Sequence, residues 1–262
     1  MAADVKLSKR LTAIAEMVNA AGPTEQKDKT EYCLCDVGTD HAHIPIRLLM
    51  DGIIDRAIAM DVIEGPLEKA RGNIELYDVA DKVTLRISDG LDAYRPGEAQ
   101  GLVIAGMGGR IMSRILLREP DKTRDFAEII LQPQADPEFV RRAVRELGLF
   151  IDREKIVLED NKYYPVMHVS SNSCPGPVWK TDAEDDGSFR EAEDLFGPVL
   201  IRDRDSMLKS YLLWQKGVND RIMYSLQKAN NAETAAIKEK TAEVIKKERL
   251  IRTALEYFEV MG

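Results

Sequence analysis

The sequence is poor in cysteine and in aromatic residues. Its 262 residues contain three cysteines, at positions 33, 35 and 174, and aromatic residues make up 6% of the chain. Because the count is odd and no CxxC or zinc-ligand spacing occurs, we expect buried, reduced thiols rather than a disulfide framework or a metal site. The low aromatic content and the 31% of charged residues favour a helix-rich globular protein over a β-sandwich.

Long hydrophobic runs are also missing from the sequence. No apolar stretch approaches the roughly 18–20 residues that a membrane-spanning helix requires. Residues 1–18 alternate charges at helical spacing and contain neither a signal-peptide core nor a cleavage site. We therefore expect a cytoplasmic protein that uses neither a membrane nor an obligate protein partner.

A surplus of basic residues, the usual basis of phosphate binding, is absent as well. The formal net charge is −8, but the acids are concentrated in residues 181–194, where seven acids accompany one arginine. The overall acidity argues against tight non-specific binding to nucleic acid. It does not exclude a local basic face.

Short apolar runs, each followed by turn residues, are typical of buried parallel strands. They occur at 32–37, 57–61, 102–105 and 129–132, with a shorter candidate at 84–87. Helical patterns fall between them, at 44–51, 66–77, 111–118 and 137–147. The alternation of strand and helix predicts a parallel sheet with helices on both faces.

The alternation stops after residue 147. Two strand-like runs, 151–159 and 163–170, are separated by only three residues, which predicts a hairpin and an antiparallel end to the sheet. A parallel sheet closed in this way resembles the core of class I methyltransferases more than that of nicotinamide-dependent dehydrogenases. We therefore expect a Rossmann-like α/β fold.

The composition changes again beyond Pro175. Prolines, glycines and acids there are typical of a linker, and from about Arg202 the chain shows helical periodicity with a weak break at 229–231. Stripes spaced by threes and fours occur on both sides of this break, at Met207, Tyr211, Trp214, Val218 and Ile222, and at Ile237, Thr241, Val244, Glu248, Ile251, Leu255 and Phe258. They predict an antiparallel helical hairpin, for which packing alone is a sufficient explanation. We expect three segments: a sheet domain at 1–175, an acidic linker at 176–201 and a helical coiled-coil domain at 202–262.

The most informative polar segment follows the first predicted strand. Asp36, Gly38 and Thr39 stand where the chain leaves this strand and enters a helix, at the sheet edge where doubly wound folds bind ligands. Gly38 permits a tight turn, and the following helix N-terminus favours a carboxylate or phosphate. A single glycine after a strand is a weak signal by itself.

Asp61 strengthens this signal because it ends the second strand, 25 positions after Asp36. An acid at this place is positioned to bind a ribose diol, although an N-cap for the next helix is an alternative explanation. The chain lacks the GxGxxG of dinucleotide-binding loops and the GxxxxGK[ST] of nucleoside-triphosphate loops. These absences favour S-adenosylmethionine over NAD and nucleoside triphosphates.

Two further segments follow predicted strands. Asp89 comes after the third strand, where it either accepts a hydrogen bond from an adenine amino group or forms an Asp-Gly turn with Gly90. Residues 105–109, Ala-Gly-Met-Gly-Gly, come after the fourth. A turn needs one or two glycines, so three within four positions favour exposed backbone beside a methyl donor.

Together these segments resemble the bacterial tRNA adenine-N1-methyltransferases that modify adenine 22 of tRNA. The resemblance covers most of the chain and is carried by residues 7–11, 36–42, 44–45, 65–66, 89–91, 104–109, 131–133 and 162–164. The combination of DxGTDHAxxP with GMGG is specific, whereas either motif alone would not be. The chain departs from the family in having Asp61 where glutamate is frequent, and in its expanded acidic stretch at 181–194.

The resemblance implies S-adenosylmethionine as the cofactor, tRNA as the partner and a helical coiled-coil domain at the C-terminus. The expected cofactor contacts are Asp36, Gly38, Thr39, Asp61, Val62, Asp89, Gly90 and Ala105. The expected catalytic residues are Asp40, His41, Gly106, Met107 and Gly108. The expected tRNA contacts are Arg10, Lys162, Tyr163 and Tyr164, together with Lys238, Lys240, Lys246, Lys247 and Arg249 of the helical domain.

Neutral adenine N1 carries an in-plane lone pair, so methyl transfer requires positioning rather than prior deprotonation. We expect Asp40 to accept a hydrogen bond from the exocyclic amine, whereas helix capping is the alternative for Asp40 and for His41. Tyr163 or Tyr164 either stacks on the extruded base or packs in the core. Two other functions stay open: methyl transfer to a small-molecule or protein nitrogen, and a non-catalytic RNA-binding scaffold of the same fold.

Overall fold

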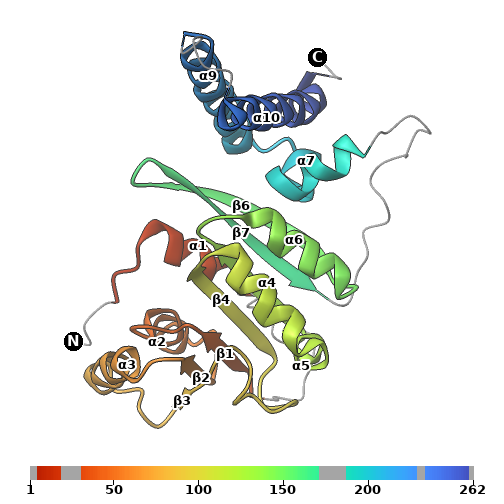
Figure 1. The fold of residues 1–262 in the computed structure, drawn as a ribbon. Coiled ribbons are helices and arrows are strands. Elements are labelled where there is room, and N and C mark those ends of the chain that lie inside the picture. Colours follow the sequence, from red (N-terminus) through yellow and green to blue (C-terminus); the bar gives the residue numbers. More distant parts are fainter. Residues whose placement is uncertain (1–4, 19–30, 171–186, 229–233, 260–262) are drawn as a thin grey trace. The chain divides into compact units, whose positions relative to one another are not determined.

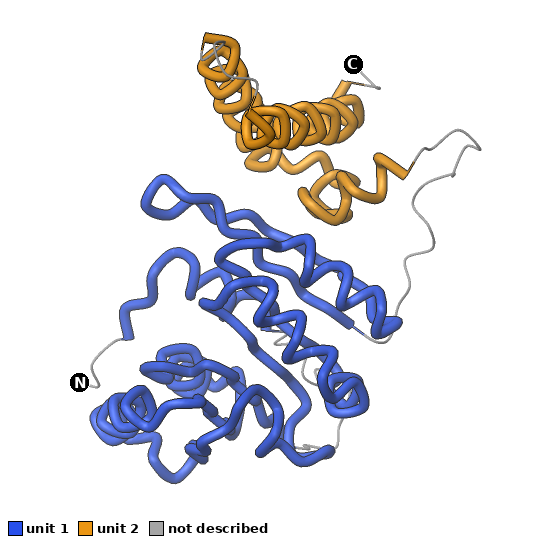
Figure 2. Tube along the Cα trace, in the orientation of Figure 1, with its two compact units in different colours: residues 1–175 blue, residues 176–262 orange. Residues whose placement is uncertain are grey.

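The computed structural model describes residues 5–18, 31–170, 187–228 and 234–259 (Figure 1). The chain divides into two compact units, Met1–Pro175 and Gly176–Gly262 (Figure 2). Cys174 and the expected helix break at 229–231 lie outside the described residues. None of the helices in the described ranges combines the length and the hydropathy of a membrane span.

Within the described residues, the first unit is built on one sheet of seven strands in the order β3-β2-β1-β4-β5-β7-β6. The strands are β1 (Cys33–Val37), β2 (Arg56–Asp61), β3 (Val83–Ile87), β4 (Gly101–Met107), β5 (Glu128–Pro133), β6 (Phe150–Glu159) and β7 (Lys162–Ser170). Strands β1 to β5 pair in parallel, and β7 runs antiparallel to both β5 and β6. The predicted parallel sheet with a terminal antiparallel hairpin is therefore confirmed.

Helices cover both faces of this sheet, which explains why its central strands consist largely of apolar residues. The helices are α1 (Lys9–Met17), α2 (His43–Met50), α3 (Glu64–Leu76), α4 (Gly109–Arg118), α5 (Pro120–Asp125) and α6 (Pro137–Glu146). Cys35 and Leu131 belong to the core that contains α4 and α6 side chains, whereas Leu34 and Ile130 belong to the core with α1, α2 and α3. Alternate residues along each strand therefore face different helical layers.

The chain reverses its direction of winding between β1 and β4. From β1 the sheet continues to β2 and β3 on one side, whereas β4 and β5 lie on the other (Figure 1). In an open α/β sheet the carboxyl ends of the strands form a ligand-binding crevice at such a reversal. The loops after β1 and β4 are therefore the places where a functional site is expected.

The second unit consists of helices in its described residues. They are α7 (Ser188–Phe196), α8 (Pro198–Arg202), α9 (Ser206–Lys228) and α10 (Ala235–Glu259). Residues 188–202, expected to belong to an acidic linker, are thus mostly helical, while residues 176–186 lie outside the described part of the chain. Phe189 of α7 contacts Tyr257 of α10, with ring centroids 4.8 Å apart, so the order of this segment depends on a partner distant in the sequence.

Helices α9 and α10 form the predicted antiparallel hairpin. Arg204, just before α9, donates to the carbonyl of Tyr257 near the end of α10, whereas Asn219 contacts Glu248 closer to the connection. The stripe predicted for α10 faces inward at Val244 and Ile251. For α9 the prediction is wrong, because the residues that are buried are each one position later in the sequence than the predicted ones.

The buried side of α9 is partly polar. It consists of Leu208, Leu212, Gln215 and Asn219, whereas Trp214 of the predicted stripe is 46% exposed. Gln215 Nε2 donates to Tyr211 Oη over 3.2 Å. Because polar residues occupy two of the four buried positions, a search for apolar periodicity selects the neighbouring side of the helix.

Candidate active site

A cavity of about 230 Å³ opens at the carboxyl ends of β1, β4 and β5. It is lined by Arg10, Leu11, Asp36, Gly38, Thr39, Asp40, His41, His43, Ile44, Ala105, Gly106, Gln132 and Gln134. These residues come from α1, the end of β1 and the β1–α2 loop, α2, the end of β4, and the end of β5 with the residue that follows it. The cavity therefore occupies the crevice that the reversal of the sheet creates.

The floor of this cavity is formed from one face of the sheet. Asp36 lies between Cys35 and Val37, which both face α4 and α6, so its side chain projects to the face of α1 and α2. The same alternation places Gln132 on this face, next to Ile130 along β5. Ala105 packs on this face as well and is paired in register with Gln132.

Asp36 is the buried acid of the site. It is 3% exposed, and Thr39 donates a hydrogen bond of 2.6 Å from Oγ1 to its Oδ2. Burial raises the pKa of Asp36 to about 7, while the bond from Thr39 lowers this pKa and the neighbouring Asp61 raises it. A carboxylate held in this way is stabilised by a cation such as an ammonium group, because the charge is otherwise poorly solvated.

The loop after β1 has an unusual backbone. Gly38, Asp40 and Ala42 all have positive φ, at 76°, 48° and 56°. The amides of Gly38 and Thr39 both donate to the carbonyl of Met60 in β2, which holds the loop at the sheet edge. Glycine is favoured here by its positive φ, whereas a Cβ would lie 2.8 Å from Met107 Cε, the mobile end of a flexible side chain.

Asp40 and His41 line the cavity but do not cap α2. The N-cap residue of α2 is Ala42, and no side chain caps it. His41 Nε2 lies 3.5 Å from Asp40 Oδ2, and the His41 ring stacks on His43 with centroids 5.3 Å apart. Burial and the nearby His41 lower the pKa of His43. The capping alternative therefore does not account for either residue.

Asp61 lies at the end of β2, beside the cavity rather than in its lining. Its Oδ1 accepts from the amide of Ile63 over 3.2 Å, and its Oδ2 accepts from the amide of Asp40 over 3.4 Å. The N-cap of α3 is Ile63, so Asp61 is not a helix cap. Each carboxylate oxygen keeps capacity for a further donor, such as a hydroxyl of a diol.

Exposed apolar side chains follow Asp61. Val62 is 59% exposed, Ile63 61% and Ile87 60%, and Ile87 is paired in register with Asp61. Three large apolar residues grouped at the ends of β2 and β3 are a surface suited to a flat apolar ligand group.

Asp89 and Gly90 are not brought into the cavity. Asp89 Oδ2 forms an ion pair of 2.7 Å with Arg118 Nη1, and Arg118 also contacts the Asp89 carbonyl and Asp92. Gly90 is buried, and a Cβ there would lie 3.0 Å from Ile115 Cγ2. An adenine amino group would share the Asp89 carboxylate with Arg118.

The three glycines at the end of β4 and the start of α4 have separate roles. Gly106, with φ 78°, lines the cavity, and the nearest atom to a Cβ there is Gln134 Nε2 at 3.8 Å. Gly108 is the N-cap of α4 and has no close neighbour. A Cβ on Gly109 would overlap the carbonyl oxygen of Asp136. Only Gly106 of this run borders the cavity, whereas Gly109 serves packing and Met107 lies partly buried beside the core.

Arg10 reaches the cavity from α1 and is held by the terminal hairpin. Its guanidinium lies 5.0 Å from the ring centroid of Tyr164, and its Nε lies 3.9 Å from Glu159 Oε2. The Arg10 amide donates to Glu159 Oε1 over 3.3 Å. Lys162, Tyr163 and Tyr164 are not among the lining residues of the cavity. Tyr164 is connected to the cavity by its contact with Arg10, which does line it.

The sequence reasoning missed several lining residues, above all Gln132 and Gln134. Gln132 is fully buried at the end of an apolar strand. A polar residue at the end of an apolar strand is a signal that the sequence contains. The same signal identifies Asp36 and Asp61 as candidates, and it could have identified Gln132.

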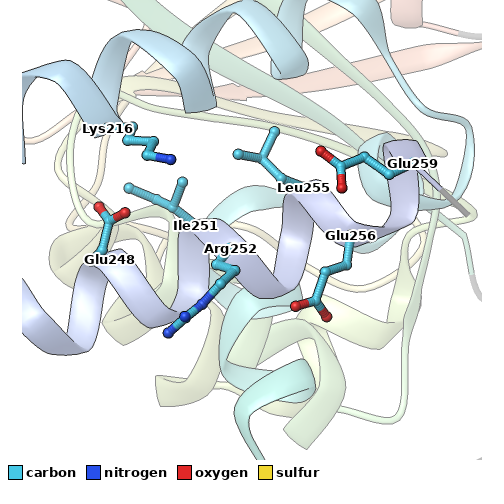
Figure 3. A pocket seen from close by; sticks show the side chains of 7 residues that line it. All are labelled: Lys216, Glu248, Ile251, Arg252, Leu255, Glu256 and Glu259. Carbon is cyan, nitrogen blue, oxygen red and sulfur yellow. The ribbon is translucent and has the colours of Figure 1, made fainter.

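The helical unit has a cavity of its own, of about 260 Å³, between α9 and α10 (Figure 3). Lys216 and Arg252 line it together with Ile251, Leu255 and three glutamates, Glu248, Glu256 and Glu259. This mixture of charges is poorly suited to a phosphate. Among the lysines expected to contact tRNA, Lys240 pairs with Glu243 at 2.8 Å and Lys246 with Glu191 at 3.0 Å.

Comparisons with known proteins find relatives that are similar along nearly the whole chain. The chain is 27% identical over 255 residues to the tRNA (adenine(22)-N(1))-methyltransferase of Bacillus subtilis, covering 97% of this chain and 99% of that protein. The crystal structure of the B. subtilis m1A22 tRNA methyltransferase TrmK is similar with a TM-score of 0.76 and 25% identity, covering 96% of this chain and all of that one. A putative tRNA (m1A22) methyltransferase from Streptococcus pneumoniae, solved in complex with S-adenosyl-L-methionine, has a TM-score of 0.73 and 27% identity, covering 95% of this chain and all of that one.

A family model described as a methyltransferase domain matches residues 7–167. This range contains every strand of the sheet except the last residues of β7, together with the whole lining of the cavity. The chain belongs to this methyltransferase domain family.

Proposed function

We propose that this protein transfers a methyl group from S-adenosylmethionine to N1 of an adenine in tRNA, at position 22. The observation that carries the proposal is the similarity to the B. subtilis enzyme, which extends over 97% of this chain and includes the helical unit as well as the sheet. The partner is tRNA, and the place of action is the cytoplasm.

The residues around the crevice fit the three parts of the cofactor. The buried Asp36 carboxylate suits the ammonium group of the methionine part, and Gly38 leaves room for it. Asp61 has free acceptor capacity for the ribose diol. Val62, Ile63 and Ile87 offer an apolar surface for the adenine ring. When bound, the cofactor supplies an electrophilic methyl group on a positively charged sulfur.

The protein's own task is then to hold adenine N1 in line with that methyl group. Gly106 leaves open space at the end of β4. This strand is the neighbour of β1, where Asp36 is proposed to bind the methionine part of the cofactor. Asp40 and Arg10 border the same cavity, which supports a contact of Asp40 with the base and of Arg10 with its phosphate. Because N1 reacts through its lone pair, no residue has to remove a proton before transfer, and the rate depends on distance and orientation.

Methyl transfer to defined tRNA transcripts tests this proposal. One transcript carries adenine at position 22, and a matched transcript carries guanine there. We expect incorporation of one methyl group into the first only, and mapping of the product to N1 of that adenine. Methylation of protein or small-molecule nitrogens instead of tRNA would contradict the substrate, and failure to bind S-adenosylmethionine in calorimetry would indicate a non-catalytic scaffold.

A further inference from the structure

Gln132 carries a buried amide side chain that lines the active cavity. It ends the apolar run of β5, is 0% exposed and lies beside Ala105 in the register of β4 and β5. Its side chain projects to the same face of the sheet as Asp36, and both residues line the cavity. A polar side chain in this place needs hydrogen-bond partners, because burial removes it from water.

Only one end of this amide has a partner in the described residues. Nε2 donates a hydrogen bond of 2.9 Å to the carbonyl of Pro133. Because the Pro133 carbonyl oxygen can only accept a hydrogen bond, the amide nitrogen of Gln132 must face it. Oε1 therefore points away from Pro133. Oε1 is buried and has no hydrogen-bond partner among the described residues. The site therefore presents an acceptor that a donor on a ligand can satisfy.

The order of the strands indicates which ligand carries that donor. Asp61 on β2 and Asp36 on β1 are placed for the ribose and the methionine part of the cofactor, whereas Gln132 stands on β5, beyond β4 and Gly106. The cofactor side and Gln132 are thus separated by the strand where methyl transfer is proposed. The donor is therefore expected on the target base rather than on the cofactor.

Adenine offers such a donor beside its reactive atom. N1 is an acceptor with a lone pair, and the adjacent exocyclic amine carries two N–H groups. Guanine and inosine have the opposite pattern, N1–H next to the O6 acceptor, so their oxygen would face Gln132 Oε1. On the basis of the proposed function, we propose that Gln132 Oε1 accepts a hydrogen bond from the exocyclic amine of the target adenine and makes the site selective for adenine over 6-oxopurines.

Purine riboside at the target position provides the sharpest test, because it keeps the N1 lone pair and lacks the exocyclic amine. The ratio of kcat/KM for adenine to that for purine riboside is measured for the wild-type protein and for Gln132→Leu. We expect the ratio to fall by roughly tenfold in Gln132→Leu, because the variant loses the acceptor for one N–H of the amine, while Asp40, expected to accept from the other, is unchanged. Gln132→Glu keeps an acceptor oxygen and is expected to retain most of the wild-type preference. The affinity for S-adenosylmethionine is expected to stay within about twofold in both variants, and this measurement also reports whether they fold.

An unchanged ratio in Gln132→Leu would overturn the inference. A large loss of S-adenosylmethionine affinity with an unchanged ratio would also overturn it and would assign Oε1 to the cofactor's ammonium group. If Gln132→Leu fails to fold, the wild-type ratio decides, since equal kcat/KM for adenine and purine riboside in the wild-type protein contradicts the contact. Absence of adenine methylation by the wild-type protein would refute the proposed function itself, and the inference with it, whereas active wild type with an unaltered ratio would refute the inference alone.

Discussion

Thr39 Oγ1 donates a hydrogen bond of 2.6 Å to Asp36 Oδ2 in the floor of the active cavity. This bond favours the ionised carboxylate, but burial opposes it more strongly and raises the pKa of Asp36 to about 7. The acid proposed to hold the cofactor's ammonium group is therefore half protonated near neutral pH in the free protein.

The first prediction is that cofactor affinity increases with pH. Only the ionised form of Asp36 pairs with an ammonium group, and a pKa of about 7 implies that roughly a tenth of the protein is ionised at pH 6 and nine tenths at pH 8. The dissociation constant of S-adenosylmethionine should therefore fall about tenfold between these pH values. Calorimetric titration measures it, with Thr39→Val as the comparison, in which the midpoint should move to higher pH. A flat profile would contradict the role of Asp36.

Asp36→Asn is expected to separate stability from binding. Because folding raises the pKa of Asp36 above its ordinary value of 3.8, the folded state binds the proton more tightly than the unfolded chain. The acid therefore lowers the stability of the folded state progressively as the pH rises from about 4 to 7. At pH 8 the asparagine variant should gain about 4 kcal/mol in free energy of unfolding, because the pKa rises from 3.8 to about 7 and each pKa unit corresponds to about 1.4 kcal/mol, and it should lose cofactor binding.

Urea unfolding at pH 8 and at pH 4.5 measures this difference. The gain of Asp36→Asn over wild type should shrink at the lower pH, where Asp36 is protonated in the folded state. An equal gain at both pH values would assign the effect to packing instead of charge.

The glycine run after β4 supplies the third prediction. Gly109→Ala should lower the free energy of unfolding by about 2–4 kcal/mol, because the new methyl group overlaps the carbonyl oxygen of Asp136. Gly106→Ala should cost about 1–2 kcal/mol through its φ of 78° and should also reduce methyl transfer, since Gly106 lines the cavity. Gly108→Ala, in open space at a helix N-cap, should cost about 0.5 kcal/mol. Equal losses in free energy of unfolding at all three positions would contradict the separate roles given to these glycines.

The sequence predicted the sheet well because its signal is local. Strands buried on both faces are largely apolar runs, as in β1 and β5, and the three residues 160–162 between the last two predicted runs leave a hairpin as the simplest arrangement. The acids of the crevice were found for the same reason, since Asp36 and Asp61 stand at strand ends.

The features that sequence reasoning missed depend on partners far away in the chain. Helix α7 is acidic enough to resemble a linker, and its order reflects contacts such as Phe189 with Tyr257. Asp89 looks like a free acceptor until Arg118, 29 residues later, is seen to bind it. Gln132 shows its unpaired oxygen only once the bond to Pro133 fixes the amide.

The last prediction concerns the contact between Arg10 and Tyr164. If Tyr164 stacks on the target base, its removal harms activity independently of Arg10. The structure instead places the Arg10 guanidinium 5.0 Å from the Tyr164 ring centroid, and Arg10 Nε 3.9 Å from Glu159 Oε2, so we expect Tyr164 to act by orienting Arg10. Tyr164→Phe keeps the ring and should leave kcat/KM for tRNA within about twofold, whereas Arg10→Ala should lower it by roughly tenfold.

The double variant distinguishes the two roles of Tyr164. Residues that act through one another give non-additive effects, so Tyr164→Leu should cost several-fold in the wild-type background and almost nothing once Arg10 is alanine. Steady-state kinetics on tRNA, with S-adenosylmethionine affinity measured in parallel, provides the cycle. Fully additive losses would mean that Tyr164 contacts the RNA directly, and the terminal hairpin would then be part of the substrate-binding surface rather than a support for α1.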